Sequence, residues 1–248
     1  VILVDDPLGA LQALAAAHRR RRDDVRWIGI TGSNGKTTTK ELLAEVLAES
    51  YGHDAVFRSQ GNYNSEIGLP LSVLQVASRH RIAVLELAMN KAGEIGTLTD
   101  IALPQYALIT NIGDAHIGKL GSRDAIAGEK RRIFSALRSY DCALVYGGEP
   151  YRDFLLDGRS AKSRVLFFGE TSTEGFEGAV QRGDGSWDLR WSGQDIHVSL
   201  PGRHNLRNIL AAMSVAVDLG VSEGAVAAAL TRVRSVSGRS EVITGAVT

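Results

Sequence analysis

The sequence predicts an α/β fold: a mainly parallel sheet with helices on both faces, plus a small antiparallel β-extension. Three observations predict it. A glycine-rich stretch at residues 29–37 stands between an apolar run and a segment of helical periodicity. From residue 55 to residue 168, short apolar segments alternate with amphipathic ones, as in β–α units. Beyond residue 176, apolar and polar residues alternate one by one, as in antiparallel hairpins.

The composition fits a globular α/β protein and favours neither a nucleic acid nor a membrane as partner. The 28 Lys and Arg residues balance 28 Asp and Glu, so no overall field attracts a polyanion. Cys142 is the one cysteine, which excludes a disulfide framework, and its apolar neighbours predict a buried strand position. The sequence has no run of about 18 apolar residues and no signal-peptide pattern. We therefore expect a cytoplasmic monomer without membrane insertion.

Residues 1–24 are expected to connect into a nucleotide-binding domain, in a chain that is a piece of a longer polypeptide. Their helical pattern ends in four arginines at residues 19–22, which would also suit a nucleic-acid patch. Cations complement the dipole at the end of a helix, and Asp23 and Asp24 follow at once. We therefore favour a solvated helix end.

Residues 29–37 read Gly-Ile-Thr-Gly-Ser-Asn-Gly-Lys-Thr, and the functional prediction depends on them. The apolar run before this stretch predicts a buried strand. Residues 42–47 carry apolar side chains at helical spacing and predict a helix over residues 38–51. Strand, glycine loop and helix form the context that a P-loop requires.

The residue types in this loop suit a nucleoside triphosphate. Gly32 and Gly35 let the backbone curl so that its N–H groups point at an anion, and the following helix adds its positive dipole end. Lys36 supplies a charge for the terminal phosphates, and the Thr37 hydroxyl can ligate Mg²⁺. The alternative is a glycine-rich turn that binds nothing, and the correct flanks argue against it. We predict that the chain binds a nucleoside triphosphate.

The remaining elements follow from apolar periodicity and from turn and cap residues. We expect strands at residues 55–58, 82–87, 106–110, 142–146 and 164–168. We expect helices up to about residue 77, over 93–103 before Pro104, from the N-cap Ser122 to residue 137, from the turn at 201–208 to Gly220, and over 222–233. The antiparallel extension should occupy about 174–200, at the sheet edge, with turns at Gly183-Asp-Gly185 and Ser192-Gly193.

Several polar residues stand near expected strand ends, where parallel sheets bind ligands. Glu86 is favoured as a Mg²⁺ ligand over a surface-facing glutamate, because burial of an unpaired carboxylate is costly. His116 can contact metal or phosphate, or be a plain surface histidine, and composition does not decide. Asn62 and Asn64 either cap a helix or line a substrate cleft. Lys130, among charged neighbours, is on its own residues a solvated helix lysine.

Five motifs in this order resemble those of the Mur ligases of peptidoglycan synthesis. They are T-G-S-N-G-K-T-T-T-K-E at 31–41, G-N-Y-N-S-E-I-G-L-P at 61–70, E-L-A-M-N at 86–90, N-I-G-D-A-H at 111–116 and G-R-H-N-L-R-N at 202–208. The first two resemble most the family member that adds D-alanyl-D-alanine to UDP-N-acetylmuramoyl-tripeptide. The resemblance extends over residues 27–241.

The resemblance implies a P-loop NTPase-like central domain that binds ATP at residues 25–241. Residues 1–24 would connect it to an N-terminal domain, and residues 242–248 would begin a linker to a C-terminal one. It also implies amide formation driven by ATP through an acyl phosphate, with ATP and two Mg²⁺ ions as cofactors. The substrates would be UDP-N-acetylmuramoyl-tripeptide and D-alanyl-D-alanine. We expect that the fragment alone does not ligate.

The same resemblance implies a role for individual residues. Those that wrap the ATP phosphates would be Gly32, Ser33, Asn34, Gly35, Lys36, Thr37 and Thr38. Those that act in catalysis would be Lys36, His116 and Lys130. Thr37 and Glu86 would hold one Mg²⁺, and His116 would help hold a second with Lys130, carbamylated to an oxygen-donor anion. The residues toward the substrates would be Asn205 and Asn208 for adenine, Arg239 for ribose or phosphate, and Asn62 and Asn64 for the UDP-muramoyl substrate.

Two other functions remain open. The first is another amide ligase of the same superfamily, of the folylpolyglutamate or cyanophycin synthetase type, although the G-N-Y-N phrase favours a Mur ligase. The second is a P-loop ATPase or switch module, which would hydrolyse nucleotide without any carboxylate substrate.

Overall fold

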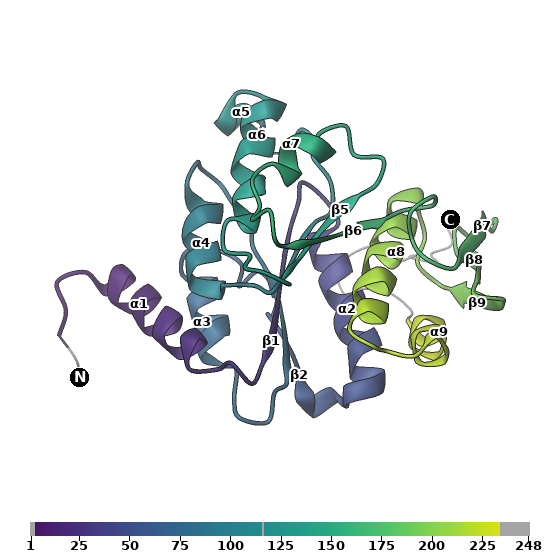
Figure 1. The fold of residues 1–248 in the computed structure, drawn as a ribbon, viewed down its shortest axis with the longest axis horizontal. Coiled ribbons are helices and arrows are strands. Elements are labelled where there is room, and N and C mark those ends of the chain that lie inside the picture. The colour runs from purple at the N-terminus through teal and green to yellow at the C-terminus, as the bar shows by residue number, and fades with distance from the viewer. Residues whose placement is uncertain (1–2, 116, 234–248) are drawn as a thin grey trace, which may run out of the picture.

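A six-stranded parallel sheet forms the centre of the computed structural model, which describes residues 3–115 and 117–233 (Figure 1). The strand order is β2-β3-β1-β4-β5-β6, and the pairs along it are parallel. The strands are β1 (Arg26–Thr31), β2 (Val56–Arg58), β3 (Ile82–Glu86), β4 (Tyr106–Ile109), β5 (Cys142–Tyr146) and β6 (Arg164–Phe168). The prediction of a mainly parallel α/β sheet is confirmed, and the strand ends agree with the expected ones to within one residue.

Helices cover both faces of this sheet, because its strands present apolar side chains on both sides. In β1, Trp27 points to one face while Ile28 and Ile30 point to the other, the period-two alternation of a strand. The helices on the Trp27 face are α1 (Pro7–Arg20), α3 (Gly68–Leu74), α4 (Glu94–Ala102) and α6 (Arg123–Lys130). Those on the other side are α2 (Lys36–Tyr51), α8 (Arg203–Asp218) and, packed on α2, α9 (Glu223–Arg232) (Figure 1). Two short helices, α5 (Ile117–Leu120) and α7 (Arg152–Leu156), lie near α6 (Figure 1).

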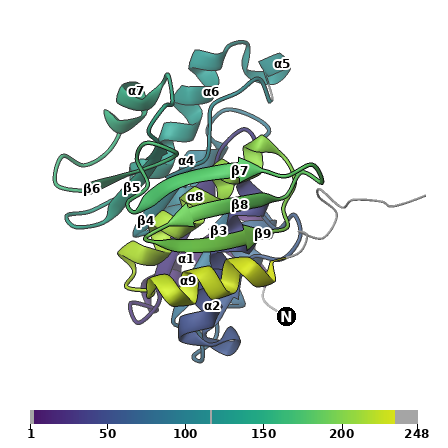
Figure 2. The ribbon, with the colours of Figure 1, turned by 90° about the vertical axis from the view of Figure 1, so that its right-hand side faces the viewer.

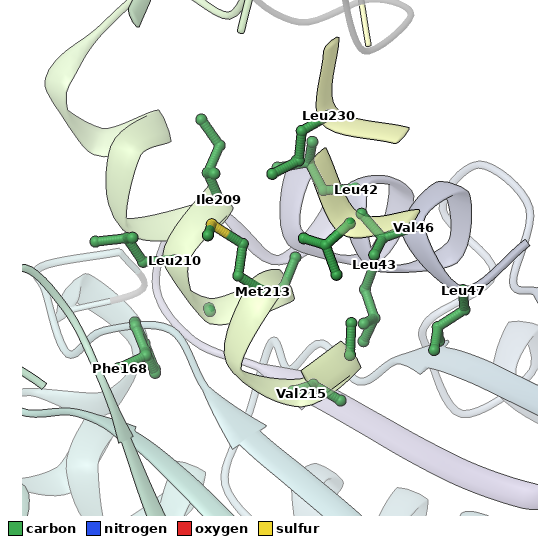
Figure 3. Close-up of a cluster of buried hydrophobic side chains, with 14 of the residues drawn as sticks. Leu42, Leu43, Val46, Leu47, Phe168, Ile209, Leu210, Met213, Val215 and Leu230 are labelled. Atoms are coloured by element: carbon green, nitrogen blue, oxygen red, sulfur yellow. The ribbon is translucent and has the colours of Figure 1, made fainter. Parts of the chain in front are cut away.

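Helices α2 and α8 pack directly against each other through apolar side chains (Figure 3). The residues that meet there are Leu42, Leu43, Val46 and Leu47 of α2 and Ile209, Leu210, Met213 and Val215 of α8, with Phe168 and Leu230 at the margin. All four α2 side chains are at most 1% exposed, as their helical spacing predicts. Each such burial stabilises the fold by roughly 1.5–3 kcal/mol. This interface fixes the start of α2 relative to the start of α8.

The antiparallel extension is a separate sheet of three strands, in the order β7-β8-β9. Its strands are β7 (Phe176–Gln181), β8 (Trp187–Trp191) and β9 (Gln194–Val198), and both turns fall at the predicted glycines. The expected place at the edge of the main sheet is wrong. Its strands lie over α8 and beside α9 (Figure 2). The apolar side of the extension, with Trp187 and Trp191, joins the core formed by these helices. Helices therefore separate the two sheets, because both present an apolar face to α8.

The helix expected from Ser122 to residue 137 is shorter in the structure. Ser122 caps α6 as predicted, since its hydroxyl accepts a hydrogen bond from the Ala125 N–H, but α6 ends at Lys130. A 3-10 turn, Arg131–Phe134, follows and brings Ile133 and Phe134, both fully buried, into the core. The helix expected to reach residue 77 likewise ends earlier, as α3.

The predicted solvated end of α1 is only partly confirmed, because Arg20 and Arg21 are exposed but Arg19 is buried and Arg22 is half-buried. The Arg19 guanidinium, 5% exposed, lies over the Trp27 ring and donates to the carbonyls of Ala102 and Leu103 at the end of α4. Arg22 donates to the Val76 carbonyl. These contacts hold α1 against β1 and against the ends of the neighbouring helices. Within residues 3–115 and 117–233, no helix has the length and apolar character needed to span a bilayer.

Candidate functional site

The loop between β1 and α2 has a backbone shape that requires glycine at two positions. Gly32 has φ of +148° and Gly35 has φ of +82°. A Cβ atom at Gly32 would overlap the Thr110 hydroxyl, and one at Gly35 would overlap the side-chain oxygen of Asn208. The loop therefore lies tightly against the end of β4 on one side and against α8 on the other.

The start of α2 has the features of an anion site. Its N-cap is Gly35, and no side chain caps the first turn. The first N–H groups of a helix lack intrahelical acceptors and carry the positive end of the dipole, so they suit phosphate oxygens. The Lys36 ammonium donates to the Gly32 carbonyl oxygen at 2.9 Å, which holds its charge over the loop.

Residues that follow β4 hold this loop from behind. The Thr110 hydroxyl donates to the Asn34 carbonyl at 2.6 Å, and the Asn111 side chain bonds both the N–H and the carbonyl of Asn34. The Ser33 hydroxyl exchanges hydrogen bonds with the backbone of Gly113. Sequence reasoning assigned no role to Thr110 or Asn111. The pairing of β1 with β4 brings these residues to the loop, and one sequence does not reveal which strands pair.

Glu86 ends β3 and faces the glycine loop. Its carboxylate is 2% exposed and accepts a hydrogen bond from the Thr37 hydroxyl at 2.8 Å. The Asn64 amide donates to its other oxygen at 2.9 Å. The backbone N–H of Glu86 donates to the Ser59 hydroxyl at 3.2 Å. Burial of this carboxylate is therefore compensated by donors. Thr37 and Glu86 lie together, as expected of two ligands of one cation, whereas the contact of Asn64 with Glu86 was not predicted.

Lys130 lies in the same site, so its interpretation as a solvated lysine is wrong. Its side chain reaches inward from the last turn of α6, is 1% exposed and donates to the Gly32 carbonyl at 3.0 Å. Burial, with the nearby Lys36 charge as a second cause, lowers the pKa of Lys130 to about 7. A substantial fraction of this amine is therefore neutral at physiological pH. Helical periodicity did not show that α6 ends at Lys130 rather than continuing, and so it gave no indication that this side chain is buried.

The two asparagines of α8 lie behind the glycine loop. Asn208 is 4% exposed, accepts from the Thr39 hydroxyl at 3.3 Å, and donates to the Asn205 side-chain oxygen at 3.0 Å. Asn205 in turn donates to the Pro201 carbonyl at 2.7 Å. Asn208 thus supports the conformation of Gly35, a contact that sequence reasoning did not foresee.

The other predicted site residues are less well defined. Asn62 is exposed, and its carbonyl accepts the Asn64 N–H at 2.7 Å, so it supports the turn that delivers Asn64. His116 and Arg239 lie outside the described residues. Within the described ranges, no group of three or more His, Cys, Asp or Glu side chains is arranged to hold a metal. A cation at Glu86 and Thr37 would therefore need ligand oxygens from elsewhere, as Mg²⁺ at a nucleotide does.

Comparison with known proteins identifies the family of this chain. The model of the Mur ligase middle domain matches residues 30–216. A UDP-N-acetylmuramoyl-tripeptide–D-alanyl-D-alanine ligase of Treponema pallidum is 38% identical over 247 residues, which is 100% of this chain and 52% of the relative. This chain thus spans about half the length of that relative.

Solved structures agree as well. A crystal structure of MurF from Acinetobacter baumannii superposes with a TM-score of 0.90 at 29% identity, covering 99% of this chain and 54% of that one. MurF of Thermotoga maritima, solved in complex with ADP, gives a TM-score of 0.80 at 30% identity, covering 96% of this chain and 55% of that one. With a family model that matches most of its residues, and a glycine loop and buried glutamate arranged as its motifs predict, this chain belongs to the Mur ligase family.

Proposed function

We propose that the full-length protein containing this chain is an ATP-dependent ligase that joins D-alanyl-D-alanine to UDP-N-acetylmuramoyl-tripeptide. The observation that carries the proposal is the buried Glu86 carboxylate, 2.8 Å from the Thr37 hydroxyl at the start of an anion-binding helix. Relatives that bear this name support the choice of substrates. The protein would work as a monomer in the cytoplasm, where ATP is available.

The residues present fit ATP with Mg²⁺. Thr37 and Glu86 offer a hydroxyl and a carboxylate, the hard oxygen donors that Mg²⁺ prefers beside nucleotide phosphates. When bound there, Mg²⁺ would neutralise charge on the β- and γ-phosphates. The loop and the first turn of α2 would orient those phosphates through residues Gly32, Ser33, Asn34, Gly35, Lys36, Thr37 and Thr38. Lys36 would contribute its charge where negative charge develops on the transferred phosphoryl group.

Lys130 would complete a second Mg²⁺ site together with His116. A neutral lysine amine can add to CO₂, with loss of a proton, to give a carbamate whose oxygens suit Mg²⁺. The lowered pKa of Lys130 supports this modification, because only the neutral amine has the free electron pair that forms the new bond. The ammonium form would instead repel a cation.

The proposed reaction has two steps. A terminal carboxylate oxygen of the tripeptide bonds to the γ-phosphorus of ATP, the bond to ADP breaks, and an acyl phosphate forms. The amine nitrogen of D-alanyl-D-alanine then bonds to the acyl carbon, phosphate leaves, and the nitrogen loses a proton. Water would hydrolyse the acyl phosphate, so we infer that flanking domains close over the site to exclude it.

The remaining assignments belong to the same proposal. Residues 25–241 would form the central domain, with a connector at 1–24 and the start of a linker at 242–248. Asn205 and Asn208 would lie toward the adenine, and Arg239 toward the ribose or phosphates. Asn62 and Asn64 would lie toward the UDP-muramoyl substrate. Because the resemblance implies that flanking domains bind the UDP-sugar and bring the incoming amine, the isolated chain is expected to form no pentapeptide.

Phosphate release by the full-length protein tests the proposal. With ATP, Mg²⁺ and both substrates, we expect phosphate and pentapeptide in equal amounts, and little phosphate when either substrate is omitted. Glu86→Gln should lower kcat by at least about 100-fold, since it removes a group that acts on transition-state charge. Glu170→Gln, on an exposed carboxylate, is the matched control and should behave as wild type.

Two outcomes would support the alternatives instead. Phosphate release at a rate that depends on neither substrate would favour an ATPase or switch. Amide formation with a folate and glutamate, or with a poly-aspartate backbone, in place of the muramoyl-tripeptide would favour another ligase of the superfamily.

A further inference from the structure

Lys40 is a completely buried cation that the proposed reaction does not use. It lies on α2, one turn after the glycine loop, and its side chain is 0% exposed. Its ammonium donates to the Ser59 carbonyl at 2.5 Å and forms an ion pair with the Glu41 carboxylate at 2.9 Å. A buried ammonium is costly to desolvate, so its burial depends on these two partners.

The carbonyl that Lys40 holds belongs to a residue that also holds Glu86. Ser59 directly follows β2, and its N–H donates to the Val84 carbonyl of β3 at 3.1 Å. Its hydroxyl accepts the Glu86 N–H at 3.2 Å. The Glu86 carboxylate then accepts from Thr37, which stands three residues before Lys40 on α2. These contacts form a closed ring from α2 through Ser59 and Glu86 back to α2.

Ser59 also begins the segment that makes a second contact with Glu86, at its carboxylate. The chain runs from Ser59 through the turn at residues 60–63 to Asn64, whose amide donates to Glu86 at 2.9 Å. The Asn64 carbonyl accepts the Ala88 N–H at 2.9 Å, which ties the turn to the chain after β3. The segment that Lys40 anchors therefore contacts Glu86 twice, at its N–H through Ser59 and at one carboxylate oxygen through Asn64. Thr37 of α2 contacts the other carboxylate oxygen.

We propose that Lys40 is a positioning residue, which holds Ser59 against α2 and thereby fixes the Glu86 carboxylate at the place where it meets Thr37 and a nucleotide-bound divalent cation. The inference rests on the proposed function of Glu86 and Thr37. A long cationic side chain suits this task, because it spans from a buried helix face to a strand-end carbonyl and bonds it strongly. Residues behind metal ligands typically change metal affinity by about 10- to 100-fold when they are replaced.

The test measures metal-dependent nucleotide binding rather than turnover. ADP affinity of the full-length protein is determined by calorimetry in EDTA and in Mg²⁺, and the ratio of the two gives the gain due to the cation. Lys40→Met and Ser59→Ala should each lower this gain by about 10-fold while they leave the affinity in EDTA nearly unchanged. Lys162→Met, on an exposed lysine, should change neither value. Binding of Mn²⁺ in the presence of ADP, followed by electron paramagnetic resonance, should weaken in the same two variants.

Glu86→Gln separates failure of this inference from failure of the proposed function. If Glu86→Gln keeps the full gain in ADP affinity due to Mg²⁺, the proposed assignment of a metal site to Glu86 is wrong. If Glu86→Gln loses the gain while Lys40→Met and Ser59→Ala keep it, the role of Lys40 is overturned. An equal loss of affinity in EDTA and in Mg²⁺ would also overturn it, because a purely structural lysine predicts that result. Should Lys40→Met fail to fold, Lys40→Gln decides, since it removes the charge and shortens the reach to the Ser59 carbonyl but keeps a polar side chain, whereas Ser59→Ala tests only the link from Ser59 to the Glu86 N–H.

Discussion

Replacement of Gly35 by alanine tests whether the glycine loop is held in shape by α8. At φ of +82° and ψ of −6°, an alanine pays roughly 1 kcal/mol for the left-handed backbone. Its Cβ would also displace the Asn208 side chain. That movement breaks hydrogen bonds to Thr39 and Asn205, at 3.3 Å and 3.0 Å, each worth about 1 kcal/mol. We therefore expect Gly35→Ala to lower the free energy of unfolding by roughly 3 kcal/mol.

Urea unfolding of a double-mutant cycle measures the part due to Asn208. Asn208→Ala alone should cost about 2 kcal/mol, because it leaves two buried partners unpaired. The double variant should be more stable than the sum of the single effects predicts, by about 2 kcal/mol, since the two Asn208 hydrogen bonds are lost only once and alanine at position 208 makes room for the new Cβ. Gly183→Ala, where a Cβ meets no atom within 4 Å, is the matched control. Additive single effects, or a Gly35→Ala variant within about 0.5 kcal/mol of wild type, would refute the reasoning.

Three further predictions concern stability, each checked by urea unfolding. Arg19→Leu should cost about 2–3 kcal/mol, because it removes two hydrogen bonds to the end of α4 and the contact with Trp27, and an unchanged midpoint would contradict it. Trp191→Ala, at 1% exposure between the antiparallel sheet and α8, should cost about 3–5 kcal/mol, and less than about 1 kcal/mol would show that this sheet adds little to the core. Asp218→Asn should cost about 1 kcal/mol at pH 7, because the Arg164 guanidinium lowers the pKa of Asp218. That carboxylate contributes stability above its unfolded pKa of about 4, and this stability is lost as the pH falls through its lower folded pKa. The difference in free energy of unfolding between Asp218→Asn and wild type should therefore shrink in acid. A difference that stays constant down to pH 2 would argue against the ion pair.

Most of the fold could be predicted from local patterns, because the central strands β1, β3, β4 and β5 are buried on both faces and are read as short apolar runs. The antiparallel strands were also recognisable, since Gly185 and Gly193 adopt positive φ in their turns. The position of the antiparallel sheet in the fold could not be predicted. Its apolar face could cover either the sheet edge or a helix, and only the packing of Trp187 and Trp191 with α8 decides between the two.

The candidate site likewise has some features that local sequence patterns predict and others that they do not. Gly32, Lys36, Thr37 and Glu86 could be predicted because a strand, a glycine loop and a strand-end carboxylate have a fixed geometry in parallel sheets. The environment of Lys130 depends on where α6 stops, and its burial follows from long-range packing that helical periodicity does not encode. The supporting contact of Asn208 likewise joins positions 173 residues from Gly35 along the chain, which no local pattern relates.

The Gly32 carbonyl has one consequence for how a polyanion would enter the loop. The side-chain nitrogens of Lys36 and Lys130 both donate to this one peptide oxygen, at 2.9 Å and 3.0 Å. The backbone dipole thereby holds the two amines together, and the nearby Lys36 charge is one cause of the lowered pKa of Lys130. A phosphate arriving at the loop would find the Lys36 charge already in place, and Lys36 could exchange backbone oxygens for phosphate oxygens. Recognition then requires a turn of one flexible side chain and no refolding of the loop.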